Sequence, residues 1–384
     1  MRILHVCLAA FYIDNYSYQE NLLPKYHKVN GHQVEIIASL QTFDKNGEAA
    51  YFGNESRYKN ENGIWVNRIN YINNWSIIKK LRIYKNYFSI IEQFKPDIIF
   101  LHGCQFSTIK PIIKYKMKNP NVKIFVDNHA DFSNSATNWL SLEILHKKIW
   151  KRKAQLINQY TEKFYGVLPS RVDFLTDIYN IPKRKVELLL MGGDDELIEE
   201  VKNKTIRIYP QTSVPVDTDK FVIVTIGKID EAKLEVLQLM EVIKSIEENI
   251  ILIVYGSVSI NLKERFNKNV DNFSVVYGGW LNNRDAYQAI YNSNLVIFPG
   301  RHSVYWEITA AIGKPMIVKY WKGTTHIKDK DNVFFLEDTS NKNIQKALLK
   351  VYNNQDMYID MLKNAAEFAH HFKYSEIAKK SIKS

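Results

Sequence analysis

Residues 221–230 read FVIVTIGKID, and this stretch decides the fold. Its first six residues are apolar or β-branched and predict a short buried strand that ends before Gly227. A helical pattern follows over 231–247, and a second apolar run fills 250–255. A strand, a helix and another strand in this order are the repeating unit of a parallel sheet that carries helices on both faces.

The same alternation continues toward the C-terminus. Strand-like runs occupy 273–277, 295–298 and 316–318, and helical patterns cover 284–291, a segment from about Ser303, and the tail after about Asn341. We therefore expect residues 220–365 to form one Rossmann-like domain. We expect residues 366–384 to form a C-terminal helix that packs back on the N-terminal domain.

The sequence before this domain predicts a second α/β region. Residues 203–219 contain two prolines and little periodicity, which is typical of a linker, and residues 1–202 form the N-terminal domain. Its strand-like runs lie at 2–9, 34–38, 97–101, 123–127 and 164–168, and a helical pattern lies at 18–29. The length of 384 residues suits two Rossmann-like domains that face each other across a cleft. Ligands of such sheets bind at the carboxyl ends of the strands, so dehydrogenases, epimerases and transferases all remain possible.

The charge is concentrated in one half of the chain. Residues 1–190 carry 27 Lys and Arg against 16 Asp and Glu, while the other residues carry 25 of each sign, so the net charge of +11 lies in the first half. Such a field attracts an anionic partner, for which the candidates are lipid headgroups, a lipid-pyrophosphate acceptor or nucleic acid. The alternative is a solvated lysine-rich face. The basic runs lie at 79–82, 110–118 and 147–153.

The location of the protein follows from what the sequence lacks. No run reaches the roughly 18 apolar residues that a membrane span needs, and residues 1–6 are typical of a first strand rather than of a signal peptide. We therefore expect a cytoplasmic protein, and the basic N-terminal domain predicts peripheral contact with the inner face of the plasma membrane. Cys7 and Cys104 are predicted to be buried free thiols, because two cysteines without a metal-binding spacing are ordinary in a cytosolic protein.

Several motifs occur in a fixed order along nearly the whole chain. Together they resemble the family-four retaining glycosyltransferases, and the similarity is greatest to bacterial members that build capsules, O-antigens and exopolysaccharides. This resemblance implies the GT-B fold and a metal-independent, retaining transfer of a hexose or N-acetylhexosamine. The donor would be a UDP- or GDP-sugar, and the acceptor a saccharide, in particular a lipid-linked one. The motifs are YQENLLPKYH at 18–27, GHQV at 31–34, VDNHAD at 126–131, LPSRVDFL at 168–175, LMGGDD at 190–195, TIGKID at 225–230, FPGRHSVYWE at 298–307 and GKP at 313–315.

The resemblance assigns the charge-bearing roles to three residues of the second domain. Lys228 and Lys233 would neutralise the developing negative charge of the diphosphate leaving group, although Lys233 lies one residue closer than the commonest spacing. Glu307 matches the second acid of the family's Glu-x7-Glu motif and would hold the ribose hydroxyls. The first acid is missing because Pro299 stands in its place.

Other residues of the second domain complete the expected donor site. His302, Ser303 and Val304 would open a helix whose backbone N–H groups face the diphosphate or the donor sugar, and His302 or Ser303 would replace the missing acid. The segments around Gly256, Gly279 and Trp280 would line the nucleotide pocket and contact the base.

The N-terminal domain contributes one catalytic candidate and an acceptor surface. His129 resembles the histidine beside the donor sugar and would bind a sugar hydroxyl or assist proton movement. Asp127 is interpreted as a turn cap and not as a base. Tyr16 and Tyr18 stand where the family has a Gly-Gly loop, so with Gln19 they would form an acceptor platform instead of a phosphate site.

Alternative functions are distinguished by single features. Asp217-Thr218-Asp219 spells the Asp-x-Asp of metal-dependent transferases, but it lies in the linker, so we expect no metal and no cofactor. A nucleotide-sugar 2-epimerase would share the GT-B fold but would need no acceptor surface. A dinucleotide oxidoreductase lacks its GxGxxG, and a basic nucleic-acid-binding protein lacks any recognition motif, so we expect no nucleic-acid partner.

Overall fold

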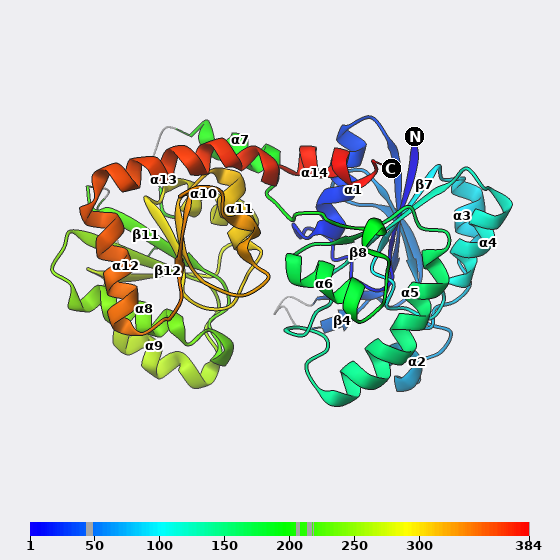
Figure 1. The fold of residues 1–384 in the computed structure, drawn as a ribbon, viewed down its shortest axis with the longest axis horizontal. Coiled ribbons are helices and arrows are strands. Elements are labelled where there is room, and N and C mark those ends of the chain that lie inside the picture. The colour runs from blue at the N-terminus through cyan, green and yellow to red at the C-terminus, as the bar shows by residue number, and fades with distance from the viewer. Residues whose placement is uncertain (44–48, 205–207, 213–216, 218, 384) are drawn as a thin grey trace. The chain divides into compact units, whose positions relative to one another are not determined.

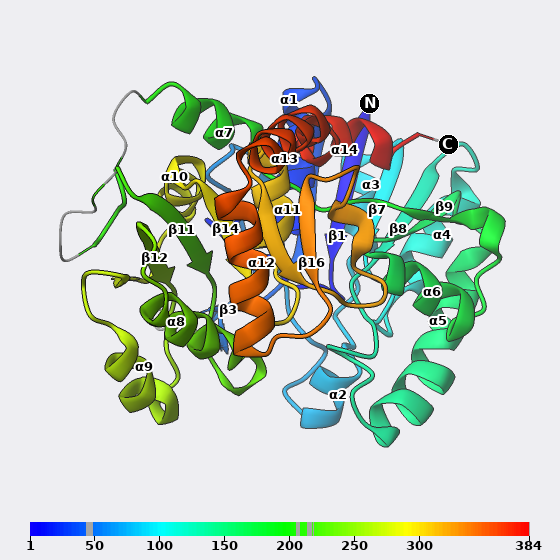
Figure 2. The same ribbon diagram turned by 60° about the vertical axis from the view of Figure 1, so that its left-hand side comes forward.

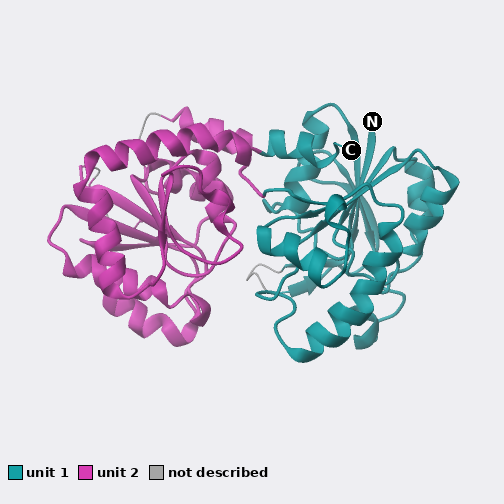
Figure 3. Cartoon of the chain, in the orientation of Figure 1, with its two compact units in different colours: residues 1–190, 374–384 teal, residues 191–373 magenta. Residues whose placement is uncertain are grey.

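The structure is a computed structural model. It describes residues 1–43, 49–204, 208–212, 217 and 219–383. The chain divides into two compact units (Figure 3). Unit 1 comprises residues 1–190 and 374–384, and unit 2 comprises residues 191–373.

Unit 1 is built on an eight-stranded sheet in the order β10-β9-β8-β7-β1-β2-β6-β5 (Figure 1). All neighbours are parallel except β5 and β6, which pair antiparallel, and a separate antiparallel pair is formed by β3 and β4. The strands are β1 (Arg2–Cys7), β2 (Gln33–Ser39), β3 (Gln41–Phe43), β4 (Ala49–Tyr51), β5 (Ser56–Lys59), β6 (Trp65–Ile69), β7 (Ile98–His102), β8 (Lys123–Asn128), β9 (Lys163–Gly166) and β10 (Val186–Leu188).

Helices cover both faces of this sheet because its central strands are buried throughout. The helices α1 (Gln19–Val29) and α14 (Tyr374–Ser381) share one core with it. A larger core on the other face takes in α3 (Phe88–Phe94), α4 (Lys110–Lys118) and α5 (Lys151–Asn158). The remaining helices are α2 (Ser76–Lys80), the π-helix η1 (Leu140–Trp150), α6 (Pro169–Asp177) and the short 3-10 helix η2 (Lys183–Lys185).

Unit 2 contains a six-stranded, fully parallel sheet in the order β13-β12-β11-β14-β15-β16 (Figure 2). Its strands are β11 (Phe221–Ile226), β12 (Ile250–Tyr255), β13 (Val275–Gly279), β14 (Leu295–Phe298), β15 (Met316–Lys319) and β16 (Val333–Leu336). Its helices are α7 (Asp195–Lys202), η3 (Glu231–Lys233), α8 (Glu235–Ser245), η4 (Ile260–Leu262), α9 (Lys263–Asn269), α10 (Asn283–Asn292), α11 (Tyr305–Ile312), η5 (Thr325–Ile327), α12 (Asn341–Asn353), α13 (Gln355–Phe368) and η6 (Ala369–Phe372).

The strand order places a switch point in each sheet. In unit 2 the chain winds outward in one direction from β11 and in the other from β14, and these two strands are neighbours. In unit 1 the neighbours β1 and β7 have the same relationship. Loops that leave two such strands diverge to opposite sides, so a crevice opens beyond their carboxyl ends. The sequence-predicted pair of Rossmann-like domains is confirmed by these two sheets.

Most predicted strands coincide with observed ones, and 221–226, 250–255 and 295–298 agree to the residue. Two boundaries differ for local reasons. The strand predicted at 273–277 begins at Val275, because the Asp271 carboxylate accepts hydrogen bonds from the backbone of Phe273, Ser274 and Val275 and holds a turn. The helix predicted from Ser303 begins at Tyr305.

The unit boundaries lie at different residues from those that the sequence indicated. Residues 191–202 were expected in the N-terminal domain, but α7 packs on α10, and the Asp194 backbone donates to the Tyr287 hydroxyl of unit 2 at 2.7 Å. The return to unit 1 occurs at Tyr374, eight residues later than expected, where α14 begins and packs on α1. Residues 205–207, 213–216 and 218 of the expected linker, including Thr218 of the Asp-x-Asp sequence, lie outside the described residues.

Two further findings concern the cysteines and the length of the helices. Cys7 and Cys104 are buried and free, as predicted. Across the part of the chain that the structure describes, no helix has both the length and the apolar character needed to cross a membrane.

Candidate functional site

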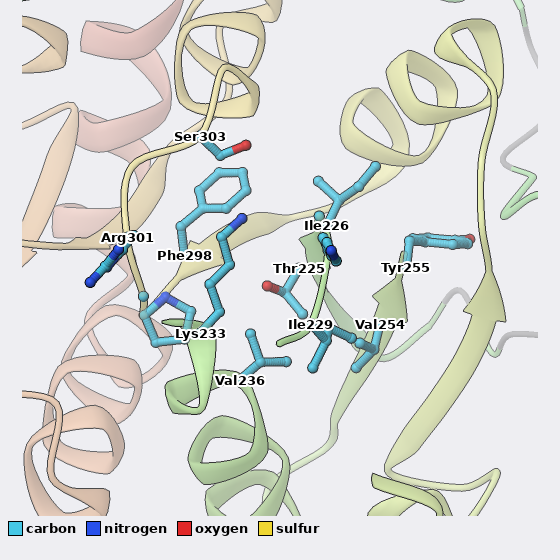
Figure 4. Close-up of a pocket in the computed structure, with 14 residues that line it drawn as sticks. Thr225, Ile226, Ile229, Lys233, Val236, Val254, Tyr255, Phe298, Arg301 and Ser303 are labelled. Atoms are coloured by element: carbon cyan, nitrogen blue, oxygen red, sulfur yellow. The ribbon is translucent and has the colours of Figure 1, made fainter. Parts of the chain in front are cut away.

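The switch point of unit 2 carries a pocket formed by the loops after β11 and β14 (Figure 4). Cationic side chains meet here, since both loops begin at the carboxyl ends of neighbouring strands. Sequence-predicted residues in its lining are Lys228, Lys233 and Ser303. The full lining is Thr225, Ile226, Gly227, Lys228, Ile229, Lys233, Val236, Val254, Tyr255, Phe298, Pro299, Gly300, Arg301 and Ser303.

Lys233 is the half-buried cation of this pocket. Its side chain rises between the ends of β11 and β14 with its amine directed toward Ser303 (Figure 4). Burial lowers the pKa of its ammonium, and Lys228 lowers it further, while Asp230 acts in the opposite direction. Among the described residues, no carboxylate lies within ion-pair distance of Lys233. A desolvated cation without a counter-ion is a natural anion-binding group.

Two further cations border the same pocket. Lys228 is exposed on the loop after β11, and Arg301 is exposed on the loop after β14. Arg301 was not identified from the sequence as a site residue, although it stands directly after the Pro-Gly that ends β14. In Figure 4 it turns to the side opposite Lys233, so the two cations reach different parts of the loop.

The predicted glycines serve the packing of the strand ends. Gly256 has a φ of +131°, and a Cβ at this position would lie 1.9 Å from the carbonyl oxygen of Gly227. The Gly256 backbone donates to the Gly279 carbonyl at 2.7 Å, and Trp280 is 63% exposed. Gly256, Gly279 and Trp280 do not line the pocket. The two glycines instead allow the strand ends beside the pocket to pack closely.

Glu307 lies inside unit 2 and is fully buried. Its Oε1 accepts hydrogen bonds from His302 Nε2 and from His326 Nε2, each at 2.7 Å, and its Oε2 has no partner among the described residues. Burial would raise the pKa of this carboxyl, but the two imidazoles outweigh it and hold the pKa at about 2. His326, on η5, was not identified from the sequence, because it lies 19 residues beyond Glu307.

The start of α11 is only partly in the pocket. Ser303 lines it, and its hydroxyl accepts a long hydrogen bond of 3.4 Å from the Tyr305 backbone. His302 and Val304 are not in the lining: the His302 ring packs edge-on against Trp306 and donates to Glu307. His302 therefore supports the carboxylate rather than facing the pocket.

A larger pocket, of about 780 Å³, lies at the switch point of unit 1. His102 and Gly103 at the end of β7, His129 after β8, and residues 9–11 after β1 form its floor. Lys79, Lys80 and Arg82 on or after α2, together with η1, form its rim. The pocket is thus basic on one side and carries two imidazoles at its base.

His129 is the sequence-predicted residue at the base of this pocket. The ring is 26% exposed, and its Nε2 is turned inward, 3.3 Å from Asp127 Oδ2 and 3.7 Å from Glu20 Oε1. Burial lowers the pKa of His129, but Asp127 and Glu20 more than offset this, so its pKa lies above the usual value. The inward position of Nε2 leaves Nδ1 as the ring nitrogen available to a ligand.

Asp127 has a larger role than the turn cap predicted from the sequence. It is fully buried, and its Oδ2 accepts a hydrogen bond from Gln19 Nε2 at 3.0 Å and lies 3.0 Å from His102 Nδ1. Burial opposes ionisation, but His129 and His102 together keep its pKa below the usual value. Asp127 is therefore an ionised carboxylate that orients His129.

The predicted acceptor platform is only partly supported by the contacts. Gln19 is buried and bonded to Asp127, so it orients the carboxylate instead of facing a ligand. Tyr16 and Tyr18 stack on each other with centroids 5.2 Å apart, and Tyr16 also contacts Phe43. Neither tyrosine lines the pocket of unit 1.

Two sets of side chains bring possible metal-ligating atoms within 4.8 Å of one another. In the first, which is Glu20, His102 and His129, both nitrogens of His102 are already engaged, by Asp127 and by His5. In the second, which is His302, Glu307 and His326, both imidazoles donate to one carboxylate oxygen. Hydrogen bonds account for both sets, and we assign neither as a metal centre.

Comparison with known proteins places this geometry in a fold family. No protein-family model matches the chain, and no curated protein matches it. A glycosyltransferase from Rickettsia africae ESF-5 superposes with a TM-score of 0.66 at 15% identity, covering 99% of this chain and 96% of that one. HepE from Anabaena, solved with UDP and glucose, superposes with a TM-score of 0.59 at 11% identity, covering 98% of this chain and 97% of that one. A UDP-GlcNAc 2-epimerase from Neisseria meningitidis bound to UDP-GlcNAc superposes with a TM-score of 0.56 at 13% identity, covering 99% of this chain and 98% of that one. The chain therefore has the GT-B fold that the sequence predicted.

Proposed function

We propose that this chain is a nucleotide-sugar-dependent glycosyltransferase whose donor binds in the pocket of unit 2. The observation that carries the proposal is Lys233, a half-buried ammonium without a carboxylate partner among the described residues, at the switch point of a Rossmann-like sheet. A donor diphosphate supplies the missing counter-charge. The likeness to HepE, which was solved with UDP and glucose, supports a UDP-sugar, and a GDP-sugar remains the other candidate donor.

The pocket of unit 2 offers what departure of a nucleoside diphosphate requires. Negative charge grows on the leaving phosphate in the transition state, and Lys233, Lys228 and the Ser303 hydroxyl are positioned along one pocket to stabilise it. These groups supply positive charge without a metal ion. By resemblance, transfer of the hexose or N-acetylhexosamine retains configuration. Glu307 is fully buried and does not line this pocket, so we assign it no ribose contact; it anchors His302 and His326 instead.

The pocket of unit 1 is proposed to hold the acceptor saccharide. It is wide enough for a sugar, and His129 presents Nδ1 at its base as a group that binds or deprotonates a hydroxyl. Lys79, Lys80 and Arg82 at its rim suit a phosphate attached to that saccharide. A lipid-linked saccharide, used in bacterial surface polysaccharide synthesis, combines both features.

The rim of this pocket also supports peripheral contact with an anionic membrane. The helices α2 and η1 lie side by side, with η1 leading directly into α5, in both views of the ribbon (Figures 1 and 2). They expose large apolar side chains next to basic ones, and this combination partitions into a lipid interface. The apolar members and their exposed fractions are Trp75 70%, Ile77 53%, Trp139 71% and Leu140 51%, and the basic members are Lys147, Lys148, Lys151 and Arg152.

Vesicle sedimentation tests the membrane part on its own. Replacing Trp75 and Trp139 with Ser removes the apolar anchors, and we expect binding to vesicles containing anionic lipid to fall by about tenfold or more. Trp280→Ser is the matched control, because Trp280 is equally exposed but lies in unit 2. Equal binding by all three proteins would remove the membrane claim and leave the transferase claim intact.

Thermal shift with a panel of nucleotide sugars tests the donor part. A ligand that binds only the folded protein raises its melting temperature, so one UDP- or GDP-sugar is expected to stabilise the wild type. Lys233→Ala is expected to lose most of that shift, whereas Lys346→Ala, an exposed lysine on α12, keeps it. A shift that survives in Lys233→Ala would refute the assigned pocket.

A nucleotide-sugar 2-epimerase is the competing function, because one of the similar structures is such an enzyme. Incubation with the stabilising nucleotide sugar alone separates the two. A transferase leaves the donor sugar unchanged or hydrolyses it slowly, whereas an epimerase inverts it without an acceptor.

A further inference from the structure

A chain of three buried histidines runs from the pocket of unit 1 to helix α14. It begins at Asp127, which lies 3.0 Å from His102 Nδ1. His102 Nε2 lies 3.0 Å from His5 Nδ1, and His5 Nε2 lies 2.9 Å from His27 Nδ1. All three rings are fully buried, and they come from β7, β1 and α1.

The far end of the chain offers His27 two partners on α14. His27 Nε2 lies 3.1 Å from the Ala378 carbonyl oxygen and 3.0 Å from the Ser381 hydroxyl. The Ser381 hydroxyl is itself 2.8 Å from the Ala378 carbonyl, to which it can donate. One end of the chain is thus an acceptor, Asp127, and the other end is either an acceptor or a donor.

Counting protons shows that the chain has two complete arrangements. Burial holds the pKa of His5 well below the usual value and that of His27 at about 3, so both rings are neutral. With Asp127 ionised, each ring carries its proton on Nδ1 and donates toward Asp127, and the Ser381 hydroxyl donates to His27 Nε2. With one more proton at Asp127, each ring carries its proton on Nε2, and His27 and Ser381 both donate to Ala378. Every link is satisfied in either state, and mixed states leave a buried nitrogen unpaired, which is unfavourable.

We propose that His102, His5 and His27 are positioning residues that form a proton relay between Asp127 and the Ser381 hydroxyl. Each bridging proton moves across its own hydrogen bond toward Asp127, and the Ser381 oxygen gives its proton to His27 Nε2. Ser381 is itself fully buried, so water restores its hydroxyl proton when the last turn of α14 opens locally. The net result is one proton gained at Asp127 and one taken from solvent at the α14 end. The same transfers in the opposite direction remove the proton from Asp127.

The catalytic use of this relay rests on the proposed function. Asp127 lies 3.3 Å from His129, so a proton that His129 takes from an acceptor hydroxyl can pass to Asp127 and leave through α14 while the acceptor fills the pocket. The groups that face the two ends also influence its titration. They are His102, His129, Gln19, Glu20 and Cys7 around Asp127, Arg171 near His129, and His32 near His27.

Ring nitrogen NMR on the full chain tests the relay without any substrate. In the wild type, the 15N shifts of the three rings are expected to switch from Nδ1–H to Nε2–H together, with one midpoint, as pH falls. Ser381→Ala removes the donor that the first state needs, so the midpoint is expected to move up by on the order of one pH unit. Ser375→Ala, on the same helix, is the control and is expected to leave the midpoint unchanged.

Several results would overturn the relay. Three separate midpoints, or identical titrations in Ser381→Ala and the wild type, contradict it. If Ser381→Ala does not fold, the wild type alone decides the matter, since scalar coupling between 15N nuclei is expected across both N–H···N bonds and its absence breaks the chain. A protein that shows the coupled switch but transfers no sugar would retain the relay and lose the proposed function.

Discussion

The amine of Lys233 lies against the backbone of Gly227, so close that a Cβ at residue 227 would be 3.3 Å from Nζ. Gly227 has a φ of +141°, a conformation that other residues adopt only with strain. The glycine at the end of β11 therefore gives the lysine its space at the switch point. In the proposed function, the pairing of these two residues places the cation that binds the donor diphosphate.

A methyl group at Gly227 should move the Lys233 amine by a few tenths of an ångström, and the φ of +141° should strain the alanine backbone. We expect Gly227→Ala to weaken binding of the preferred nucleotide sugar by about tenfold, because both the strained loop and the shifted cation oppose the bound form. Titration calorimetry measures the affinity, and circular dichroism confirms folding. A folded Gly227→Ala protein with wild-type affinity would separate Lys233 from the donor.

Gly256 is expected to contribute to the stability of the fold, because its backbone packs directly against that of Gly227. Its added Cβ would lie 1.9 Å from the Gly227 carbonyl oxygen, which is backbone and cannot rotate away. We expect Gly256→Ala to lower the free energy of unfolding by roughly 2–4 kcal/mol. Gly53→Ala is the matched control, since a Cβ at Gly53 meets nothing within 4 Å, and its change should stay within about 0.5 kcal/mol. Urea unfolding of both variants gives the comparison.

The acid sensitivity of unit 2 should depend on Glu307. Its pKa falls from 4.5 to about 2 on folding, so it contributes stability that is fully present above about pH 4.5 and is lost as pH falls toward 2. Glu307→Gln removes this contribution, on the order of 3 kcal/mol at neutral pH, and its stability should decline less steeply on acidification. Denaturation at a series of pH values checks the slope. Parallel curves for the variant and the wild type would show that the two imidazoles do not stabilise the ionised carboxylate.

The activity of the unit 1 site should follow the ionisation of His129. Asp127 and Glu20 raise its pKa, so any step that uses the imidazolium is lost only as pH rises through this elevated value. Asp127→Asn removes the nearer of the two negative charges, so that limb of the pH–rate profile should move to lower pH. His129→Ala should lower kcat by about 10²–10⁴ if the ring transfers a proton. An unmoved limb in Asp127→Asn would exclude His129 as the titrating group.

The fold and part of the candidate site could be predicted from the sequence. The apolar runs at 221–226, 250–255 and 295–298 set strand boundaries to the residue, because burial on both faces demands continuous apolar sequence. Lys228, Lys233 and Ser303 lie in one pocket because their loops leave neighbouring strands. These features are local or follow from strand order, so sequence reasoning reaches them.

The rest of the site depends on contacts between distant segments. His5, His27 and His102 look like isolated core histidines until the register of β1 and β7 and the packing of α1 bring their rings together. His326 meets Glu307 only after the chain has crossed β15. Gln19 was predicted to face an acceptor but is buried against Asp127, 108 residues away. Such contacts between distant residues leave no periodic pattern in the sequence, so they could not be predicted from it.

A crystal of the chain soaked with UDP tests the central claim most directly. The account predicts the diphosphate in the pocket between the ends of β11 and β14, with a phosphate oxygen about 2.7–3.2 Å from Lys233 Nζ. Density for UDP elsewhere on the molecule, with Lys233 still without a counter-ion, would contradict it.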